Sequence, residues 1–251
     1  MNTTIDKKEI DFFSNLSREW WNLDGPLSSL HQLTDVRIKF ILRNALRINK
    51  DYESLPLKNL KCLDVGCGGG ILAERLSRLG GNVTGIDASL NAINVAKFHG
   101  EKSRLDIDYE CTSISNYLIK KNKKFDLIIA SEVIEHVNNR MLFMYELSKL
   151  AKLGSLIIIT TINRNFVSNF FAKFVAENFL NLIPKGTHDI NKFVSPETLV
   201  KEGKKFGIIF DDIAGFLPSV SLKTILNKKI DGFSLSSNSI INYGIAGIKI
   251  N

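Results

Sequence analysis

Cysteine is scarce in this chain of 251 residues, which contains only Cys62, Cys67 and Cys111 and no CxxC pair. An odd number of scattered cysteines argues against a disulfide framework and against a structural zinc site. The N-terminal stretch MNTTIDKKEIDFFSN has no apolar core of the kind found in secretory signals, and no apolar run approaches the length of a spanning helix. We therefore expect a cytoplasmic protein.

Long basic blocks are also missing, although Lys and Arg total 33 against 26 Asp and Glu, a balance of +7. The densest basic run is KKNKK at 120–124, which is typical of a solvated turn. Excess positive charge alone says nothing about fold, and it is a weak indication of a nucleic-acid partner. We predict no nucleic-acid partner.

Short apolar stretches alternate with helical patterns from residue 61 onward. Such alternation predicts an α/β fold with a doubly wound, mostly parallel sheet. Two later stretches complete seven strands, and the last alternates as an antiparallel partner would. The predicted strands are 61–66, 82–87, 107–111, 125–131, 154–162, 207–215 and 242–250, and the predicted helices between them are 69–79, 89–100, 139–152 and 195–206.

Two further regions flank this pattern. Apolar spacing predicts a helix over residues 5–22 and a second helix that begins near Thr34 and Asp35. We expect residues 1–56 to form an N-terminal helical cap and residues 57–251 to form the main domain. Within it, the Phe-rich residues 163–192 interrupt the rhythm after the fifth strand and are predicted to be an insertion that acts as a lid.

The stretch LDVGCGGG at 63–70 places glycines directly after the first predicted strand, where α/β sheets bind ligands. A dinucleotide loop would need a third glycine at position 71, which is Ile71, and no phosphate-loop lysine follows. Asp87 ends the second strand, where a carboxylate accepts from ribose hydroxyls. A nucleoside with a charged tail but no phosphate fits: S-adenosylmethionine, whose cationic groups favour Asp64 nearby, with Gly66 and Gly68 allowing close approach.

Several segments of the chain resemble those of a known enzyme family. The segments REWWNLDGPLSSLHQLTDVR, LDVGCGGGILAE, SEVIEHV and KGTHD are similar to those of class I methyltransferases, whose fold is Rossmann-like, and more closely to the ubiquinone-biosynthesis O-methyltransferases. The resemblance implies that the family's cofactor contacts fall on Arg37, Gly66, Asp87 and Ser131. The chain departs from the family at Asp35, where a proline is common two residues before the arginine.

The resemblance also implies an activity. The chain is expected to transfer methyl groups from S-adenosylmethionine to ring hydroxyls of a polyprenylated phenol or ubiquinol precursor, at both O-methylation steps. Other ubiquinone-biosynthesis proteins are expected partners. Two alternatives are a nucleic-acid or other small-molecule methyltransferase and a non-enzymatic protein that binds S-adenosylmethionine or lipid. The absence of an Asn/Asp-Pro-Pro-Tyr/Phe motif after the fourth strand argues against base methylation, and the intact loop argues against loss of activity.

The segment SEVIEHV supplies the candidate catalytic residues Glu132, Glu135 and His136, whose spacing gathers them on one side of a helical turn. Three interpretations stay open. The two carboxylates, with His136, could hold Mg²⁺ beside the substrate oxygens. They could instead be charges at a helix N-terminus, with His136 packed on adenosine, or His136 could act as a direct base. His188, in KGTHD, is a further candidate on a gating loop.

An amphipathic pattern lies inside the predicted insertion. Aromatic and aliphatic residues recur at helical spacing over 166–183, with a narrow polar stripe that includes Lys173. Such a helix could lie in the headgroup region of an anionic membrane surface, although the same pattern is common in core helices. We predict reversible binding at the inner face of the membrane.

Overall fold

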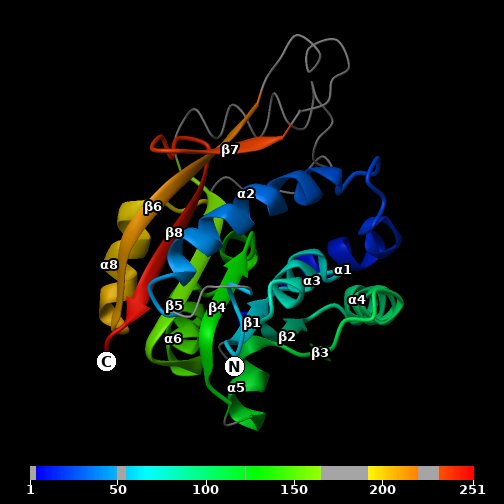
Figure 1. Ribbon diagram of the computed structural model, residues 1–251, viewed down its shortest axis with the longest axis horizontal. Helices are drawn as coiled ribbons and strands as arrows, with labels where there is room; N and C mark the ends of the chain where they lie inside the picture. Colours follow the sequence, from blue (N-terminus) through cyan, green and yellow to red (C-terminus); the bar gives the residue numbers. More distant parts are fainter. Residues whose placement is uncertain (1–3, 50–54, 122, 165–191, 220–231) are drawn as a thin grey trace.

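The computed structural model describes residues 4–49, 55–121, 123–164, 192–219 and 232–251. Within these residues the chain forms one eight-stranded sheet in the order β3-β2-β1-β4-β5-β8-β6-β7, with helices on both faces (Figure 1). The strands are β1 (Lys61–Val65), β2 (Asn82–Asp87), β3 (Ile107–Cys111), β4 (Phe125–Ser131), β5 (Ala151–Ile162), β6 (Ile208–Pro218), β7 (Phe233–Ser236) and β8 (Asn242–Lys249).

The helices divide into two groups that cover opposite faces. The α-helices are α1 (Lys7–Asn15), α2 (Ser28–Ala45), α3 (Ile71–Arg78), α4 (Leu90–Lys102), α5 (Ile114–Lys120), α6 (Arg140–Leu150) and α8 (Pro196–Lys205). Along β4, Ile129 belongs to the core that includes residues of α2, α3 and α4, whereas Ile128 belongs to the core that includes residues of α5, α6 and α8. Because successive side chains of a strand point to opposite faces, a strand that is almost wholly apolar contributes side chains to the hydrophobic core on each face. The predicted doubly wound sheet is confirmed.

The sheet has eight strands rather than the seven predicted. The first five pair in parallel, and β8 lies antiparallel between β5 and β6. The additional strand is β7, which pairs with the end of β6 at the sheet edge. Its four residues are too few for a period-two pattern to stand out from a loop. The short helix α5 was also not predicted.

The predicted N-terminal helices differ from the observed ones. The expected helix over 5–22 ends at Asn15, and a 3-10 turn (Ser17–Glu19) follows, which redirects the chain toward the glycine loop. The predicted start at Thr34 was wrong because α2 begins at Ser28. Thr34 does not cap a helix; its hydroxyl donates to the carbonyl of Leu30, one turn earlier in α2.

Helix α2 shares a core with the sheet, since Val36, Phe40 and Ile41 pack among buried residues of β4 and β5. The division of the chain at residue 56 stays a prediction. Residues 165–191 of the predicted lid, including His188, lie outside the described residues. Among the helices that the structure describes, none is long and apolar enough to cross a membrane.

Candidate functional site

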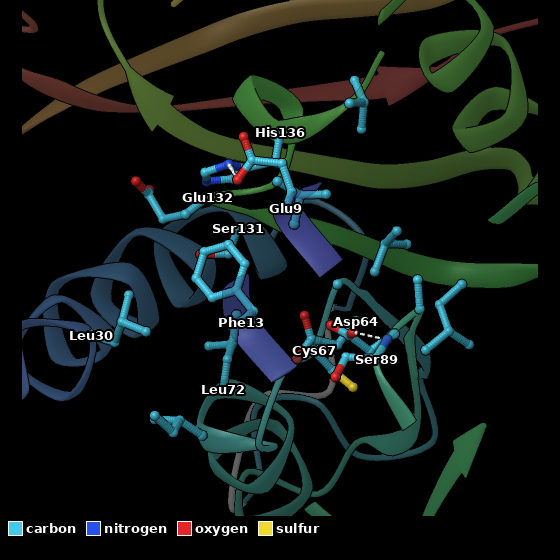
Figure 2. A pocket seen from close by; sticks show the side chains of 18 of the residues that line it. Glu9, Phe13, Leu30, Asp64, Cys67, Leu72, Ser89, Ser131, Glu132 and His136 are labelled. Atoms are coloured by element: carbon cyan, nitrogen blue, oxygen red, sulfur yellow. Dashed lines mark hydrogen bonds and ion pairs between the residues drawn. The ribbon is translucent and has the colours of Figure 1, made fainter. Parts of the chain in front are cut away.

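A cavity of about 290 Å³ opens at the carboxyl ends of β1, β2 and β4. The strands place Asp64, Asp87 and Ser131 on its wall, as expected for a ligand site in a doubly wound sheet. Figure 2 shows Asp64 and Ser131 on this wall. Helices α1 and α2 supply the opposite wall, which is mostly apolar. The structure thus brings residues from the N-terminal helices into the predicted nucleoside site.

The glycine loop is held by backbone hydrogen bonds to the neighbouring strand. The N–H groups of Gly66 and Cys67 both donate to the carbonyl of Ile86, at 2.8 and 3.1 Å. Gly68 has a φ of +52°, a left-handed conformation that side chains rarely adopt. A Cβ at Gly68 would overlap the indole of Trp20, so the position requires glycine for both backbone and space.

The two tryptophans cover this loop. Trp20 is buried against Gly68 and Gly69, and the indole N–H of Trp21 donates to the carbonyl of Gly69 at 2.9 Å. The other face of Trp21 stacks on His99, with ring centroids 3.4 Å apart. Both indoles therefore pack against the backbone of the glycine loop.

Asp87 fixes the geometry of the loop as well as facing the cavity. One carboxylate oxygen accepts from the N–H of Gly68 at 2.9 Å, and the other accepts from the N–H of Ser89 at 2.8 Å. Each oxygen keeps a further lone pair, so the carboxylate can also accept from ribose hydroxyls. Burial raises the pKa of Asp87, while these backbone donors act to lower it.

Arg37 and Asp64 are buried groups of opposite charge with unsatisfied hydrogen-bonding capacity. Among the described residues, Nε and Nη2 of Arg37 and Oδ2 of Asp64 have no hydrogen-bond partner. Nη2 lies 3.2 Å from Oε1 of Glu132, close enough for an ion pair but without hydrogen-bond geometry. Adjacent guanidinium donors suit a carboxylate, and an unpaired carboxylate oxygen suits an ammonium group. The amino-acid end of S-adenosylmethionine carries both, so the residues present fit this cofactor.

Glu132 follows β4 and is directed back toward the sheet. Its Oε1 accepts from the hydroxyl of Thr160 at 2.8 Å, and Thr160 also contacts the hydroxyl of Ser131 at 2.9 Å. The backbone φ of Glu132 is +54°, which is unusual for a residue with a side chain. Glu132 therefore holds Arg37 beside the cavity, and sequence reasoning did not anticipate Thr160.

Glu132 and His136 line the cavity, but Glu135 does not join them there. Residues Ile134–His136 form a 3-10 turn rather than an α-helix. Glu135 is buried and accepts from the hydroxyl of Thr161 at 2.9 Å, and it does not line the cavity. The part of the chain that the structure describes contains no group of three or more His, Cys, Asp or Glu arranged to hold a metal ion. These residues, as arranged, do not fit the Mg²⁺ site that their spacing suggested.

His136 lines the cavity and is paired with a residue from the opposite end of the sequence. Its Nδ1 lies 3.1 Å from Oε2 of Glu9, on α1 (Figure 2). Burial alone would lower the pKa of His136, but the hydrogen bond that its ring donates to Glu9 and the charge of Glu135 raise this pKa above its ordinary value. No pattern around Glu9 in the sequence pointed to this contact, because 127 positions separate the two residues.

Comparison with known proteins identifies the family. Residues 63–159 match the family model described as a methyltransferase domain. A ubiquinone biosynthesis O-methyltransferase of Bartonella quintana is 45% identical over 243 residues, which cover 96% of this chain and 95% of the relative. A protein of the same name from Pelagibacter ubique is 44% identical over 213 residues, covering 84% and 88%. The chain belongs to the ubiquinone biosynthesis O-methyltransferases.

The fold of this O-methyltransferase is that of class I methyltransferases. Magnesium protoporphyrin IX methyltransferase from Synechocystis, solved with bound S-adenosylhomocysteine, aligns over 97% of this chain and 100% of its own, with a TM-score of 0.65 and 16% identity. The plantazolicin methyltransferase aligns over 97% and 98%, with a TM-score of 0.58 and 17% identity. The Rossmann-like fold, predicted from the alternation of strands and helices and from the family resemblance, is confirmed, as is the use of S-adenosylmethionine, predicted from the glycine loop and Asp87.

The affinity of this O-methyltransferase for S-adenosylmethionine should rise with pH. Burial, followed by the charge of Asp87, raises the pKa of Asp64 to about 7. A cationic ligand favours the ionised carboxylate and so lowers this pKa on binding. Binding therefore releases a proton. The Kd should fall by at most about tenfold for each pH unit between about pH 5 and pH 7, and it should level off above about pH 8.

Calorimetry in two buffers with different ionisation enthalpies measures that proton release. Asp64→Asn is the matched variant, because it keeps the shape of the side chain and removes its titration. It should bind more weakly at pH 8 and show a flatter pH dependence. An equal number of protons released by the wild type and by Asp64→Asn would contradict the assignment of Asp64.

Proposed function

We propose that this enzyme methylates ring hydroxyls of polyprenylated phenol and catechol intermediates, and that it acts at both O-methylation steps of ubiquinone biosynthesis. The proposal rests on family membership along almost the whole chain. The observation that carries it in the structure is the composition of the cavity. Its lining combines the charged residues described above with apolar side chains, among them Leu30 and Leu33 of α2, Phe233 of β7 and Ile241. An apolar wall next to a cofactor site suits a phenol with a hydrocarbon tail.

The reaction needs alignment and removal of one proton. The ring oxygen attacks the sulfonium methyl, the new O–CH₃ bond forms as the S–CH₃ bond breaks, and S-adenosylhomocysteine leaves. Holding the two reactants in line supplies a large part of the barrier reduction, about 7–11 kcal/mol in favourable cases. A phenol with a pKa near that of tyrosine, about 10, is mostly protonated at neutral pH, so a base assists the attack.

His136 is the residue that we assign as this base. It lines the cavity at the carboxyl end of β4, and Glu9 contacts the Nδ1 side of its ring. The raised pKa of His136 makes its neutral ring a stronger proton acceptor. We assign Arg37 to binding the cofactor. Glu132 orients Arg37, because the two side chains form an ion pair on the cavity wall.

Methyl transfer to a soluble, short-chain demethylubiquinol analogue tests the proposed activity directly. Product should form only with S-adenosylmethionine, and the mass of the product should increase by one methyl group. A second assay with the corresponding 2-polyprenyl phenol analogue tests the other step. Methylation of the catechol analogue alone would restrict the enzyme to one step, and no product with either analogue would overturn the proposal.

The membrane is the proposed source of the substrate, because a polyprenyl tail dissolves in the bilayer. The amphipathic residues 166–183 that motivate this proposal lie outside the described residues. Replacing Phe170 and Phe171 with serine should reduce co-sedimentation with anionic liposomes and spare S-adenosylmethionine binding. Phe98→Ser is the matched control, since Phe98 is 69% exposed on α4 and its loss should leave sedimentation unchanged. Absence of liposome binding by the wild type would refute this membrane proposal.

A further inference from the structure

Helix α1 brings an acidic side chain into the site from outside the region that matches the methyltransferase family model. Glu9 lines the cavity, its side chain is 21% exposed, and Oε2 faces Nδ1 of His136 at 3.1 Å (Figure 2). The matched region begins at residue 63, whereas Glu9 belongs to the first helix of the chain. The pair exists only when α1 is docked on the methyltransferase sheet.

Several contacts dock this helix onto the segment that carries His136. The ring of Phe13 packs edge-on against the imidazole, with centroids 5.3 Å apart and planes at 85°. Just beyond the 3-10 turn, the backbone N–H of Asn138 donates to the carbonyl of Thr4 at 3.1 Å, and its side-chain amide donates to the carbonyl of Ile5. The imidazole therefore has side chains of α1 on two of its sides. Asn138, two residues after His136, is hydrogen-bonded to the residues that precede α1.

The carboxylate of Glu9 is itself held in place. Its Oε1 lies 3.5 Å from Nζ of Lys192, which also forms an ion pair with Asp6 at 2.9 Å. Asp6 is the N-cap of α1, and its side chain accepts from the N–H of Lys8. Because the two oxygens of Glu9 have different partners, rotation of the carboxylate away from His136 would break both contacts.

An ionised carboxylate can only accept a hydrogen bond, so Nδ1 of a neutral His136 must carry the proton that it donates to Glu9. The lone pair of the ring is then on Nε2. The same carboxylate stabilises the imidazolium that forms when the ring accepts the substrate proton. This is the arrangement by which an acidic partner fixes the tautomer of a histidine base.

We propose that Glu9 is a positioning residue for His136, so that the N-terminal helix completes the catalytic site rather than only covering it. The inference rests on the base role assigned to His136 under the proposed function. It explains why an acidic residue of α1 faces the cavity. Glu9 acts through His136 and does not itself take the substrate proton.

The test uses the full-length enzyme with the soluble catechol analogue. Glu9→Ala should lower kcat about 10- to 100-fold, a part of the full contribution of a general base. Glu9→Gln, which keeps an acceptor oxygen but loses the charge, should lie between Glu9→Ala and the wild type. The KM for the catechol and the Kd for S-adenosylmethionine should change little. Asp11→Asn is the matched control, because it removes one negative charge from an exposed position on the same helix and should leave kcat unchanged.

A double-mutant cycle separates positioning from a merely structural role. In a His136→Gln background, Glu9→Ala should cause no further loss of kcat, because the residue through which it acts is gone. A further loss of similar size in that background, or a parallel loss of S-adenosylmethionine affinity, would show that Glu9 only seats α1 and would overturn the inference. The ¹⁵N resonances of the His136 ring give an independent readout, since Glu9→Ala should change the tautomer balance and Asp11→Asn should not.

The outcomes also distinguish this inference from the proposed function. If the wild type methylates neither analogue, the proposed function fails and the inference fails with it. If the wild type is active and His136→Gln retains its kcat, the base assignment fails, and with it the positioning role. If His136→Gln is impaired while Glu9→Ala has the kcat of the wild type, the inference about Glu9 alone is overturned.

Discussion

Replacing His136 with glutamine should lower kcat for methyl transfer by about 10²- to 10⁴-fold, the usual contribution of a positioned general base. The imidazole lies on the wall of the cavity, and glutamine keeps a polar side chain there but cannot accept a proton at neutral pH. Affinity for S-adenosylmethionine should stay close to that of the wild type, because the charged ends of the cofactor match Arg37 and Asp64 instead. Single-turnover kinetics and calorimetry measure the two quantities separately.

Chelation distinguishes a histidine base from a metal-dependent reaction. The wild type should be assayed before and after exhaustive EDTA treatment, and again after addition of Mg²⁺. Loss of turnover on chelation that Mg²⁺ restores, together with retained activity of His136→Gln, would contradict the assignment of the base. It would also imply that Glu132 and Glu135 leave Thr160 and Thr161, the partners they have in the structure.

Gly68→Ala should both destabilise the fold and weaken cofactor binding. The φ of +52° costs an alanine about 1 kcal/mol, and the overlap with the buried ring of Trp20 adds about 1–3 kcal/mol. To relieve the overlap, either Trp20 or the loop must shift. A shift of the loop disturbs the hydrogen bond that the N–H of Gly68 donates to Asp87. We expect S-adenosylmethionine affinity to fall at least about tenfold, which corresponds to about 1.4 kcal/mol.

Gly154→Ala is the matched control for this second prediction. Gly154 has a φ of +79°, and nothing lies within 4 Å of a Cβ placed there. It should therefore lose only the backbone contribution to the free energy of unfolding, measured by denaturant titration, and keep the cofactor affinity of the wild type. Equal effects of the two substitutions on unfolding and binding would mean that contact with Trp20 is unimportant.

Sequence reasoning located the fold and the strand ends that line the cavity because local patterns encode both. Buried parallel strands such as β4 are almost wholly apolar, and the position of Asp87 follows from the end of β2. Arg37 was named only through family resemblance, since nothing in the local pattern of α2 indicates that this arginine is buried near Asp64.

The remainder depended on contacts between distant parts of the chain. Three- and four-residue spacing places Glu132, Glu135 and His136 on one side only if the turn is α-helical. The positive φ of Glu132 is incompatible with an α-helix, and residues Ile134–His136 form a 3-10 turn instead. The break after α1 likewise follows from the packing of Trp20 on the glycine loop, which overrides apolar periodicity. Glu9 could not be found because its role exists only in the folded chain.

The placement of the two tryptophans gives the protein an intrinsic optical signal. The chain contains only two indoles, Trp20 and Trp21, and both lie against the glycine loop. Trp20 also lines the cavity, whereas Trp21 stacks on His99. All tryptophan emission therefore originates from rings that contact the glycine loop. Binding of S-adenosylmethionine in the cavity is expected to change the surroundings of these rings. Cofactor binding can be followed by fluorescence without a label, and a Trp21→Phe enzyme would leave Trp20 as a single reporter on the wall of the cavity.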